Sequence, residues 1–243
     1  MYNEERNAER CVRAICAVLA ARAGGSTLFV VDDGSRDGTR GILDALLDPG
    51  LPLVVLGTPE NRGYGAALLT GARAAAAEGF EFGLFMDSDL TNDPELIPVF
   101  VERLATGSWD VIKASRYIPG GGMSGVPIAR QIPTRLGNAL ASRLFGMGLN
   151  DCTNGFRAVR LSMIVGHDLR ERGFPSILEE LLHLKRQGAR ATEIPYVLTA
   201  RTSGDASSFS YRPRVVLAYL KFALLAATVR YRPRGAGALA AAP

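Results

Sequence analysis

Histidine and cysteine are scarce in this chain of 243 residues. It holds two histidines, His167 and His183, and three cysteines, Cys11, Cys16 and Cys152, none at CxxC spacing. Each histidine stands alone in a stretch that we expect to be helical, which disfavours a histidine-based catalytic triad or metal site. The odd number of cysteines disfavours a disulfide framework and favours buried free thiols in a reducing compartment.

Long apolar runs are also missing, and the first residues show no positively charged region followed by an apolar core, the pattern of a secretory signal. The longest apolar run, VVLAYLKFALLAATV at 215–229, is interrupted by Lys221, whereas a spanning helix needs about 20 apolar residues. From Ala206 onward there are six basic residues and no acidic ones, which leaves 22 basic and 24 acidic residues in the rest of the chain. The basic character belongs to the tail, and we expect no nucleic-acid partner.

Apolar runs alternate with helical patterns over the first half of the chain. We predict strands at 27–33, 52–57, 82–86 and 109–115, and helices at 4–23, 37–47, 63–79 and 93–105. Strands that are almost continuously apolar indicate a parallel sheet covered by helices on both faces. The pattern ends near residue 115, and no later linker is long enough to separate two domains. We expect one α/β domain over 1–205 and a basic amphipathic tail over 206–243.

Two aspartates, Asp87 and Asp89, follow the third predicted strand with only Ser88 between them. Side chains two residues apart on an extended chain point the same way, so the two carboxylates repel each other unless a cation lies between them. Asp93 and Pro94 then have the features of a helix N-cap and a first helical residue. From these residues alone, a metal site and a solvated acidic turn are both open.

Further polar clusters follow in a fixed order. They are YNEE (2–5), VDDGSRDGT (31–39), NRGYGAAL (61–68), MDSDL (86–90), SRYIPGGG (115–122), DCTNGFRAV (151–159), EELL (179–182) and EIPYVLTART (193–202). Over about residues 2–205 this set resembles the family 2 glycosyltransferases of GT-A fold, and among them the dolichol-phosphate mannose synthase-like branch. The resemblance implies a mostly parallel α/β sheet. It also implies an inverting transfer of a sugar, of mannose or glucose type, from a nucleotide diphosphate sugar to a polyprenyl phosphate.

The resemblance also assigns roles to individual residues. Asp87 and Asp89 would hold Mg²⁺ or Mn²⁺ against the donor diphosphate, as catalytic residues together with Glu179, whose neighbour Glu180 is the competing assignment. Arg130 and Thr134, four apart and so on one helix face, match residues that grip the lipid phosphate. A phosphate monoester is largely dianionic near neutral pH, so the acceptor needs no strong general base. The residues expected to bind the donor are Tyr2, Glu4, Val31, Asp33, Ser88, Arg116 and Arg201.

Three residues depart from the family pattern, and the chain also begins later than that pattern. Ala206 and Ser207 stand where Ser and Lys are expected, and Thr91 stands where Gln often follows the aspartate pair, so the sugar and the acceptor stay open. The family also places a central strand just before YNEE. We therefore expect such a strand upstream of Met1, and a less stable sheet in its absence.

Other protein classes share parts of the pattern. A phospho-accepting receiver domain would use Asp32, Asp33, Asp87 and Lys113, but it leaves residues 116–205 without purpose. A nucleotide-sugar pyrophosphorylase would need a glycine-rich basic loop at the start, which this sequence lacks. A silent nucleotide-sugar binder, or a family 2 enzyme with a non-lipid acceptor, remains an alternative.

The tail carries YRPR at both ends of its apolar run, at 211–214 and 231–234. We expect this helix to lie on the inner face of the membrane, with the protein cytoplasmic and peripheral, and with Tyr211, Tyr219 and Tyr231 at headgroup level. A plain core-packing helix is the alternative. A membrane protein is carried as a further candidate partner.

Overall fold

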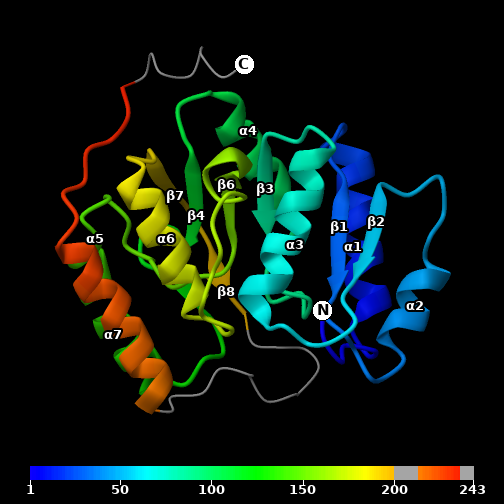
Figure 1. Ribbon diagram of the computed structural model, residues 1–243, viewed down its shortest axis with the longest axis horizontal. Coiled ribbons are helices and arrows are strands. Elements are labelled where there is room, and N and C mark those ends of the chain that lie inside the picture. Colours follow the sequence, from blue (N-terminus) through cyan, green and yellow to red (C-terminus); the bar gives the residue numbers. More distant parts are fainter. Residues whose placement is uncertain (200–212, 236–243) are drawn as a thin grey trace.

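The structure, a computed structural model, describes residues 1–199 and 213–235, without the side chain of Arg130. Its strands fall into three groups (Figure 1). The four strands that the apolar runs predicted are all present, as β1, β2, β3 and β4. The groups are β1 (Leu28–Asp32) with β2 (Leu53–Gly57); β3 (Phe82–Phe85), β6 (Arg157–Arg160), β4 (Val111–Ser115) and β7 (Ala191–Pro195), in that order; and β5 (Gly122–Met123) with β8 (Val197–Leu198).

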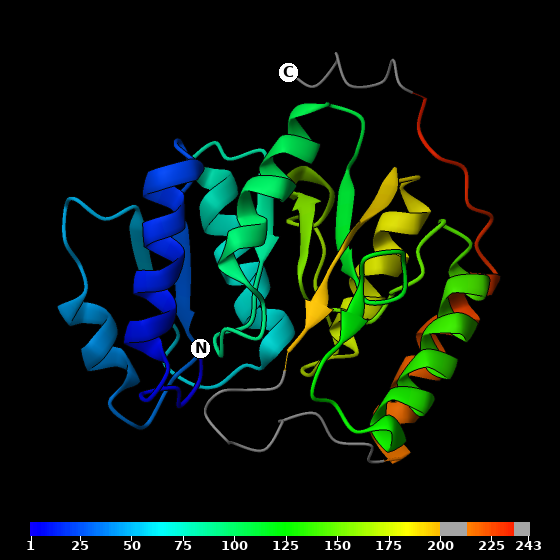
Figure 2. The ribbon, with the colours of Figure 1, turned by 180° about the vertical axis from the view of Figure 1, so that it is seen from behind.

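Helices cover both faces of the sheets, as the opposite views of Figures 1 and 2 show. On one face lie α1 (Ala8–Arg22) and α4 (Ile97–Ala105), and on the other α3 (Tyr64–Ala77) and α6 (Ser176–Arg186). Near β2 lies α2 (Thr39–Ala45), and beyond β7 lie α5 (Ile128–Phe145) and α7 (Pro213–Ala227), side by side. Short 3₁₀ turns occupy Pro94–Leu96 and Leu161–Met163. The prediction of an α/β fold with helices on both faces is confirmed.

The larger sheet is mixed, because β6 runs antiparallel to both β3 and β4. The apolar pattern did not predict β6, since its sequence RAVR reads as a solvated segment. Both arginines are nevertheless buried, and each has a carboxylate partner from another element: Arg157 pairs with Glu180, and Arg160 with Asp110. A buried arginine is tolerated where such a partner neutralises it.

The largest apolar cluster joins α3, α5, α6 and α7 to the sheet. Within it the buried Lys185 donates through Nζ to the carbonyls of Leu144 and Ala226, at 3.1 and 2.8 Å. These carbonyls lie in the last turns of α5 and α7, where helix carbonyls lack intrahelical partners and favour a positive charge. Burial lowers the pKa of Lys185. One side chain of α6 thus joins the ends of two neighbouring helices.

One face of the tail helix α7 therefore packs against the rest of the fold. Phe222, Ala223 and Ala226 are buried, and Tyr219 and Tyr231 pack against the large cluster, with Tyr231 Oη donating to the carbonyl of Ala189. The expectation that Tyr219 and Tyr231 sit at headgroup level is wrong, because both face the protein. Tyr211 lies outside the described residues. Within residues 1–199 and 213–235, no helix combines the length and apolar character that a membrane crossing requires.

Candidate active site

The acidic turn Asp87–Ser88–Asp89 follows directly after β3 and is braced from two sides. The backbone N–H of Asp87 donates to Asn92 Oδ1 at 2.7 Å, and Asn92 Nδ2 donates to Tyr196 Oη at 3.3 Å. Asp89 Oδ1 accepts from the N–H and the hydroxyl of Thr91, at 3.0 and 2.6 Å. These bonds hold the backbone of Asp87 and the carboxylate of Asp89 in place.

Between Asp89 and Thr91 the backbone takes a conformation that is uncommon for its residue type. Leu90 has φ of 57°, in the left-handed region that residues other than glycine rarely adopt. Tyr196 follows β7, the strand at the other edge of the four-stranded sheet from β3, and its hydroxyl donates to the carbonyl of Thr91. This bond holds the end of the turn. Strain of this kind persists where neighbouring contacts determine the backbone, and it is common at functional sites.

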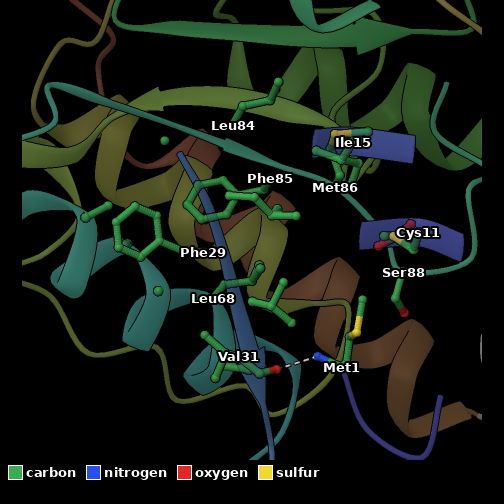
Figure 3. Close-up of a pocket in the computed structure, with 18 of the residues that line it drawn as sticks. Met1, Cys11, Ile15, Phe29, Val31, Leu68, Leu84, Phe85, Met86 and Ser88 are labelled. Atoms are coloured by element: carbon green, nitrogen blue, oxygen red, sulfur yellow. Dashed lines mark hydrogen bonds between the residues drawn. The ribbon is translucent and has the colours of Figure 1, made fainter. Parts of the chain in front are cut away.

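The turn opens into a cavity of about 660 Å³ that runs between β1 and β3. Figure 3 shows its apolar part, with Phe29 and Val31 on β1, Leu68 on α3, and Leu84 and Phe85 on β3. Met1 and Ser88 lie at its polar end. The structure brings together seven of the predicted site residues in the lining: Tyr2, Glu4, Val31, Asp33, Asp87, Ser88 and Asp89.

Asp33 shapes the wall of this cavity. Its Oδ1 accepts from the Thr58 hydroxyl and the Arg62 N–H, both at 3.0 Å, and its Oδ2 accepts from the Gly63 N–H at 2.8 Å. Gly63, at φ 96°, precedes the first residue of α3, and a Cβ there would lie 2.6 Å from the carbonyl oxygen of Arg172. The buried carboxylate therefore anchors the loop that leads into α3.

Tyr64, the first residue of α3, was not singled out from the sequence. The Cβ position built on Gly155 lies 2.8 Å from Tyr64 Oη and 3.7 Å from Asp87 Oδ1, so the missing side chain leaves room for both groups. The ring of Phe174 packs against that of Tyr64 with centroids 5.1 Å apart. Burial raises the pKa of Tyr64, with the nearby Asp87 acting in the same direction. Its hydroxyl therefore stays protonated beside the Asp87 carboxylate.

The predicted acidic residue Glu179 lies on α6 and is buried. Its Oε2 accepts from the N–H groups of Arg170 and Glu171, at 3.0 and 2.9 Å, so it supports the loop that leads to Phe174. Glu180 is committed to the ion pair with Arg157. Neither carboxylate is among the residues that line the 660 Å³ cavity.

Arg116, expected near the diphosphate, makes a two-pronged ion pair with the buried Asp151. Nε donates to Oδ2 at 2.7 Å and Nη2 to Oδ1 at 2.9 Å. Nη2 also donates to Thr153, whose hydroxyl accepts from Asn138 of α5. This network ties α5 to the loop beyond β4. Thr134 lies on α5 one turn before Asn138, and the backbone of Arg130 lies one turn before Thr134. Arg201 falls outside the described residues.

The donor set fits a hard divalent cation that binds together with a substrate. Within the described part of the chain, no group of three or more His, Cys, Asp or Glu side chains gathers as a metal site. Asp87 and Asp89 supply two carboxylates from one turn. Mg²⁺ and similar cations commonly take one or two carboxylates from the protein and complete their shell with phosphate oxygens and water.

The structure confirms the prediction for the cysteines and corrects the one for the histidines. All three cysteines are buried and free, as expected, and burial together with nearby Asp89 raises the pKa of Cys11 to about 12, so its thiol is neutral. The prediction that the histidines are isolated is wrong. The rings of His167 and His183 stack with centroids 4.4 Å apart, and His167 lies in a loop rather than a helix.

Known sequences that resemble this chain are glycosyltransferases. A model of glycosyl transferase family 2 matches residues 1–165. The undecaprenyl-phosphate mannosyltransferase of Micrococcus luteus is 30% identical over 183 residues, which cover 74% of each chain. The polyprenol monophosphomannose synthase of Mycolicibacterium smegmatis is 31% identical over 182 residues, 73% of this chain and 68% of the relative. A dolichol-phosphate mannosyltransferase of Pyrococcus furiosus is 27% identical over 90% of this chain, which spans 60% of that relative's length.

Solved structures show the same fold. The glucosyl-3-phosphoglycerate synthase of Mycobacterium tuberculosis, in complex with Mn²⁺, UDP and glucosyl-3-phosphoglycerate, superposes with a TM-score of 0.64 over 95% of this chain and 78% of its own. The same enzyme with Mn²⁺, UDP-glucose and glycerol 3-phosphate gives a TM-score of 0.63. Sequence identity is only 19 and 20% in these pairs, so the likeness concerns the fold.

Proposed function

Because the chain belongs to glycosyl transferase family 2 and is therefore a glycosyltransferase, we propose that it moves a sugar from a nucleotide diphosphate sugar to a polyprenyl phosphate. The names of the relatives from Micrococcus and Mycolicibacterium support this acceptor class. The observation that carries the proposal is the braced turn Asp87–Ser88–Asp89 at the mouth of a cavity that Tyr2 and Glu4 also line.

In this proposal Asp87 and Asp89 hold Mg²⁺ or Mn²⁺. A cation bound there would offset the charge that collects on the diphosphate as the bond to the sugar breaks, and would stabilise the transition state more than the ground state. The bonds from Thr91 keep the Asp89 carboxylate oriented before substrate binds, and the bond from the Asp87 N–H to Asn92 fixes the backbone that carries the second carboxylate. Such preorganisation lowers the cost of reaching the reactive geometry.

The nucleoside part of the donor would lie along the residues at the ends of β1 and at the start of the chain. Val31 and the Tyr2 ring offer apolar surface at this end of the cavity, and Glu4 and Ser88 offer polar groups. Asp33, which already accepts three hydrogen bonds, would act by shaping the loop before α3 rather than by a charged contact. Glu179 would act in the same indirect way, by holding the loop that carries Phe174.

On the acceptor side, a phosphate monoester dianion needs little activation, and attack opposite the leaving diphosphate inverts the anomeric carbon. The protein's task is to position the phosphate and to exclude water. We assign this positioning to Arg130 and Thr134 of α5, with the network from Asn138 through Thr153 to Arg116 holding that helix against the site. Arg201 is retained as a cation for the donor side.

A polyprenyl phosphate lies in a membrane, so the enzyme must work at its surface, and we place it on the inner face. Two helices support this placement. Exposed apolar residues recur every four positions along α5, and α7 presents a second exposed apolar face beside it. Arg214 adds positive charge, which anionic headgroups attract, whereas Lys221 is already paired with Glu171 at 3.3 Å. The exposed apolar residues of this α5–α7 face are Ile128, Ile132, Leu136, Leu140, Val216, Leu217, Leu220, Leu224 and Leu225.

A transfer assay tests the proposal. Radiolabelled GDP-mannose, UDP-glucose and related donors are each offered with a short polyprenyl phosphate or with a soluble phosphorylated acceptor, with Mg²⁺, Mn²⁺ or a chelator. Metal-dependent labelling of the lipid is expected. Labelling of the soluble acceptor alone would replace the lipid by another acceptor class, and donor binding without any transfer or hydrolysis would identify a silent binder.

A further inference from the structure

Three charged side chains form a row across the larger sheet. Strands β6, β4 and β7 lie side by side (Figure 1), and their register places Arg157 of β6 and Glu193 of β7 opposite Lys113 of β4. Residues that stand opposite each other in a sheet point to the same face, so the three side chains are neighbours. Lys113, in the middle, is buried. We refer to these three residues as the charged row.

The charged row holds the loop before β6, residues 150–155, by its backbone. Glu193 accepts from the N–H groups of the first two loop residues, at 2.9 and 2.7 Å. Arg157 donates to the carbonyl of the last loop residue, Gly155, at 2.7 Å. Between them, Lys113 Nζ donates to the carbonyl of Asn154, also at 2.7 Å. Each member of the row therefore fixes a different part of one loop.

The ammonium group of Lys113 is buried without a carboxylate partner among residues 1–199 and 213–235. The neighbouring carboxylates Asp151 and Glu180 are each paired with an arginine, and Glu193 is bound to the loop backbone. Burying an unpaired charge is costly, and apolar side chains of similar size often replace buried charges without loss of stability. An apolar residue at this position would, however, leave the carbonyl of Asn154 without this donor.

The charges around Lys113 show the same cost. Burial, with Arg157 acting in the same direction, lowers the pKa of Lys113 from the ordinary 10.5 to about 8. Asp151, Glu180 and the thiol of Cys152 act in the opposite direction but do not offset the burial. The protonated lysine is therefore less favourable in the folded protein than in the unfolded chain.

The loop at 150–155 joins the two sides of the proposed site. At its end, the Cβ position of Gly155 lies 3.7 Å from Asp87 Oδ1. In its middle, Thr153 exchanges two hydrogen bonds with Asn138 of α5, at 2.9 and 3.1 Å, and α5 is the helix assigned to the acceptor phosphate. A displacement of the carbonyl of Asn154, which lies between these two contacts, would change the spacing of both sides.

From this arrangement we propose that Lys113 is a positioning residue for the sugar transfer, whose ammonium group sets the spacing between the acidic turn and α5 by fixing the loop at 150–155. This role rests on the proposed function, since the two sides that the loop joins are the metal side and the acceptor side. Lys113 acts through the carbonyl of Asn154 and touches no substrate. Its removal should therefore lower activity without lowering stability, a combination that a residue with a purely structural role does not produce.

Lys113→Met, which keeps the length of the side chain and removes the charge, tests the proposal. Urea unfolding at pH 7 should give a stability equal to or above that of the unmodified chain. In the transfer assay kcat should fall by about tenfold or more, and the apparent KM for Mn²⁺ should rise. The matched control is Ile112→Val, on the other face of β4, which should lower stability and keep both kinetic constants.

The pH dependence gives a second measurement on the unmodified chain. Between about pH 8 and 10.5 the unfolded lysine holds its proton and the folded one loses it, so the free energy of unfolding should rise with pH relative to Lys113→Met. Over pH 7 to 9.5, kcat should instead fall, because the ammonium group is lost. Lys113→Arg stays charged over this range and should keep its activity at pH 9.5.

Amide hydrogen exchange reports on the loop without any use of activity. The N–H groups of Asn154 and Phe156 bond within the loop, at 3.2 and 3.1 Å, and in Lys113→Met they should exchange faster by on the order of tenfold. The N–H of Val111, bonded to Arg190, is the reference. Unchanged loop exchange, unchanged kinetic constants, or a Lys113→Met protein that fails to fold would each overturn the proposal. If the unmodified chain transfers no sugar, the proposed function fails, and loop exchange alone decides whether Lys113 fixes the loop.

Discussion

Arg157 of β6 and Glu180 of α6 form a two-pronged ion pair in the interior, with Nε to Oε1 and Nη2 to Oε2 both 2.6 Å long. Arg157 also donates through Nη1 to the carbonyl of Gly155 at 2.7 Å. The pair therefore holds the backbone of the residue that faces Tyr64 and Asp87. A structural ion pair and the acidic turn are in this way linked through one glycine.

Breaking this pair is expected to destabilise the fold strongly. Glu180→Leu leaves the Arg157 charge buried without a partner, at a cost of about 3–5 kcal/mol, and the double variant Arg157→Met/Glu180→Leu should recover most of it. Urea unfolding measures both. The exposed pair of Arg13 and Glu9 is the matched control, and Glu9→Leu should cost less than about 1 kcal/mol. A double variant as unstable as Glu180→Leu would show that charge burial is not the cause.

Asp89→Asn is expected to lower kcat by about 100-fold or more, because a neutral amide binds a divalent cation poorly. The Asn oxygen can still accept both bonds from Thr91, so the melting temperature should change little. Asp93→Asn, at the helix N-cap four residues on, is the control and should keep its activity. An Asp89→Asn enzyme that works normally at low Mn²⁺ concentration would refute the assignment.

Gly155→Ala is expected to displace Tyr64 or Asp87, because its new methyl group would lie 2.8 Å from Tyr64 Oη. We expect kcat to fall by roughly tenfold or more, in line with losses from misplaced catalytic groups. Gly166→Ala is the control, since a Cβ there has no heavy atom within 4 Å.

Combining Gly155→Ala with Tyr64→Phe tests whether the loss of activity arises from the contact with the Tyr64 hydroxyl. Tyr64→Phe removes the hydroxyl that the methyl group meets, so Gly155→Ala should cost less activity in a Tyr64→Phe background than in the parent chain. Metal titration of each variant reports whether the apparent KM for Mn²⁺ rises together with the loss of kcat. Strictly additive losses would mean that the two positions act independently.

The free energy of unfolding is expected to decrease as the pH is lowered, because His183 is neutral in the folded protein. Burial, followed by His167 and Arg186, lowers its pKa below the ordinary 6.5, while Glu179 and Glu180 act in the opposite direction. The unfolded chain then binds the proton more readily, so the contribution of neutral His183 is complete above pH 6.5 and is lost as the pH falls below it. Urea unfolding between pH 5 and 7.5 should show this decline, and His183→Phe, which keeps an aromatic ring against His167, should flatten it. Parallel curves for the two proteins would exclude His183 as the source.

Vesicle flotation tests the α5–α7 face. The protein should float with anionic vesicles at low salt and be released by high salt. Ile132→Ser/Leu136→Ser on α5 and Leu217→Ser/Leu224→Ser on α7 should each weaken flotation. Leu47→Ser, an equally exposed leucine after α2, should have no effect. Failure of the unmodified chain to float at low salt would leave α7 as a core helix and reject the peripheral placement.

The parts of the fold that could be predicted are those encoded locally. The strands before Asp33 and Asp87 follow from continuous apolar runs, and the N-cap at Asp93, whose side chain accepts from the Glu95 N–H, follows from its own neighbours. Strand β6 and the pairing of Arg116 could not be predicted in this way. Their partners, Glu180 and Asp151, stand 23 and 35 residues away, and only the fold brings those carboxylates to them.

The candidate site shows the same division. The acidic pair was recognisable from its spacing and the polar start of the chain from the family resemblance, and the structure brings them together in one lining. Tyr64 and Gly155 lie within the clusters at 61–68 and 151–159 but were not singled out, because a tyrosine at the first turn of a helix and a glycine in a loop have no spacing that marks them as site residues. Their role depends on a single close approach between α3 and the loop before β6.

The ammonium group of Lys185 has a mechanical consequence. Since it binds the last turns of both α5 and α7 from within α6, the three helices cannot slide past one another without stripping a buried charge of its acceptors. A force applied to the outer helices is therefore passed to the element that also carries Glu179 and Glu180. In the proposed placement of the two outer helices on a membrane, this linkage would fix the tilt of the whole molecule, and with it the direction from which a lipid-linked acceptor would approach the acidic turn.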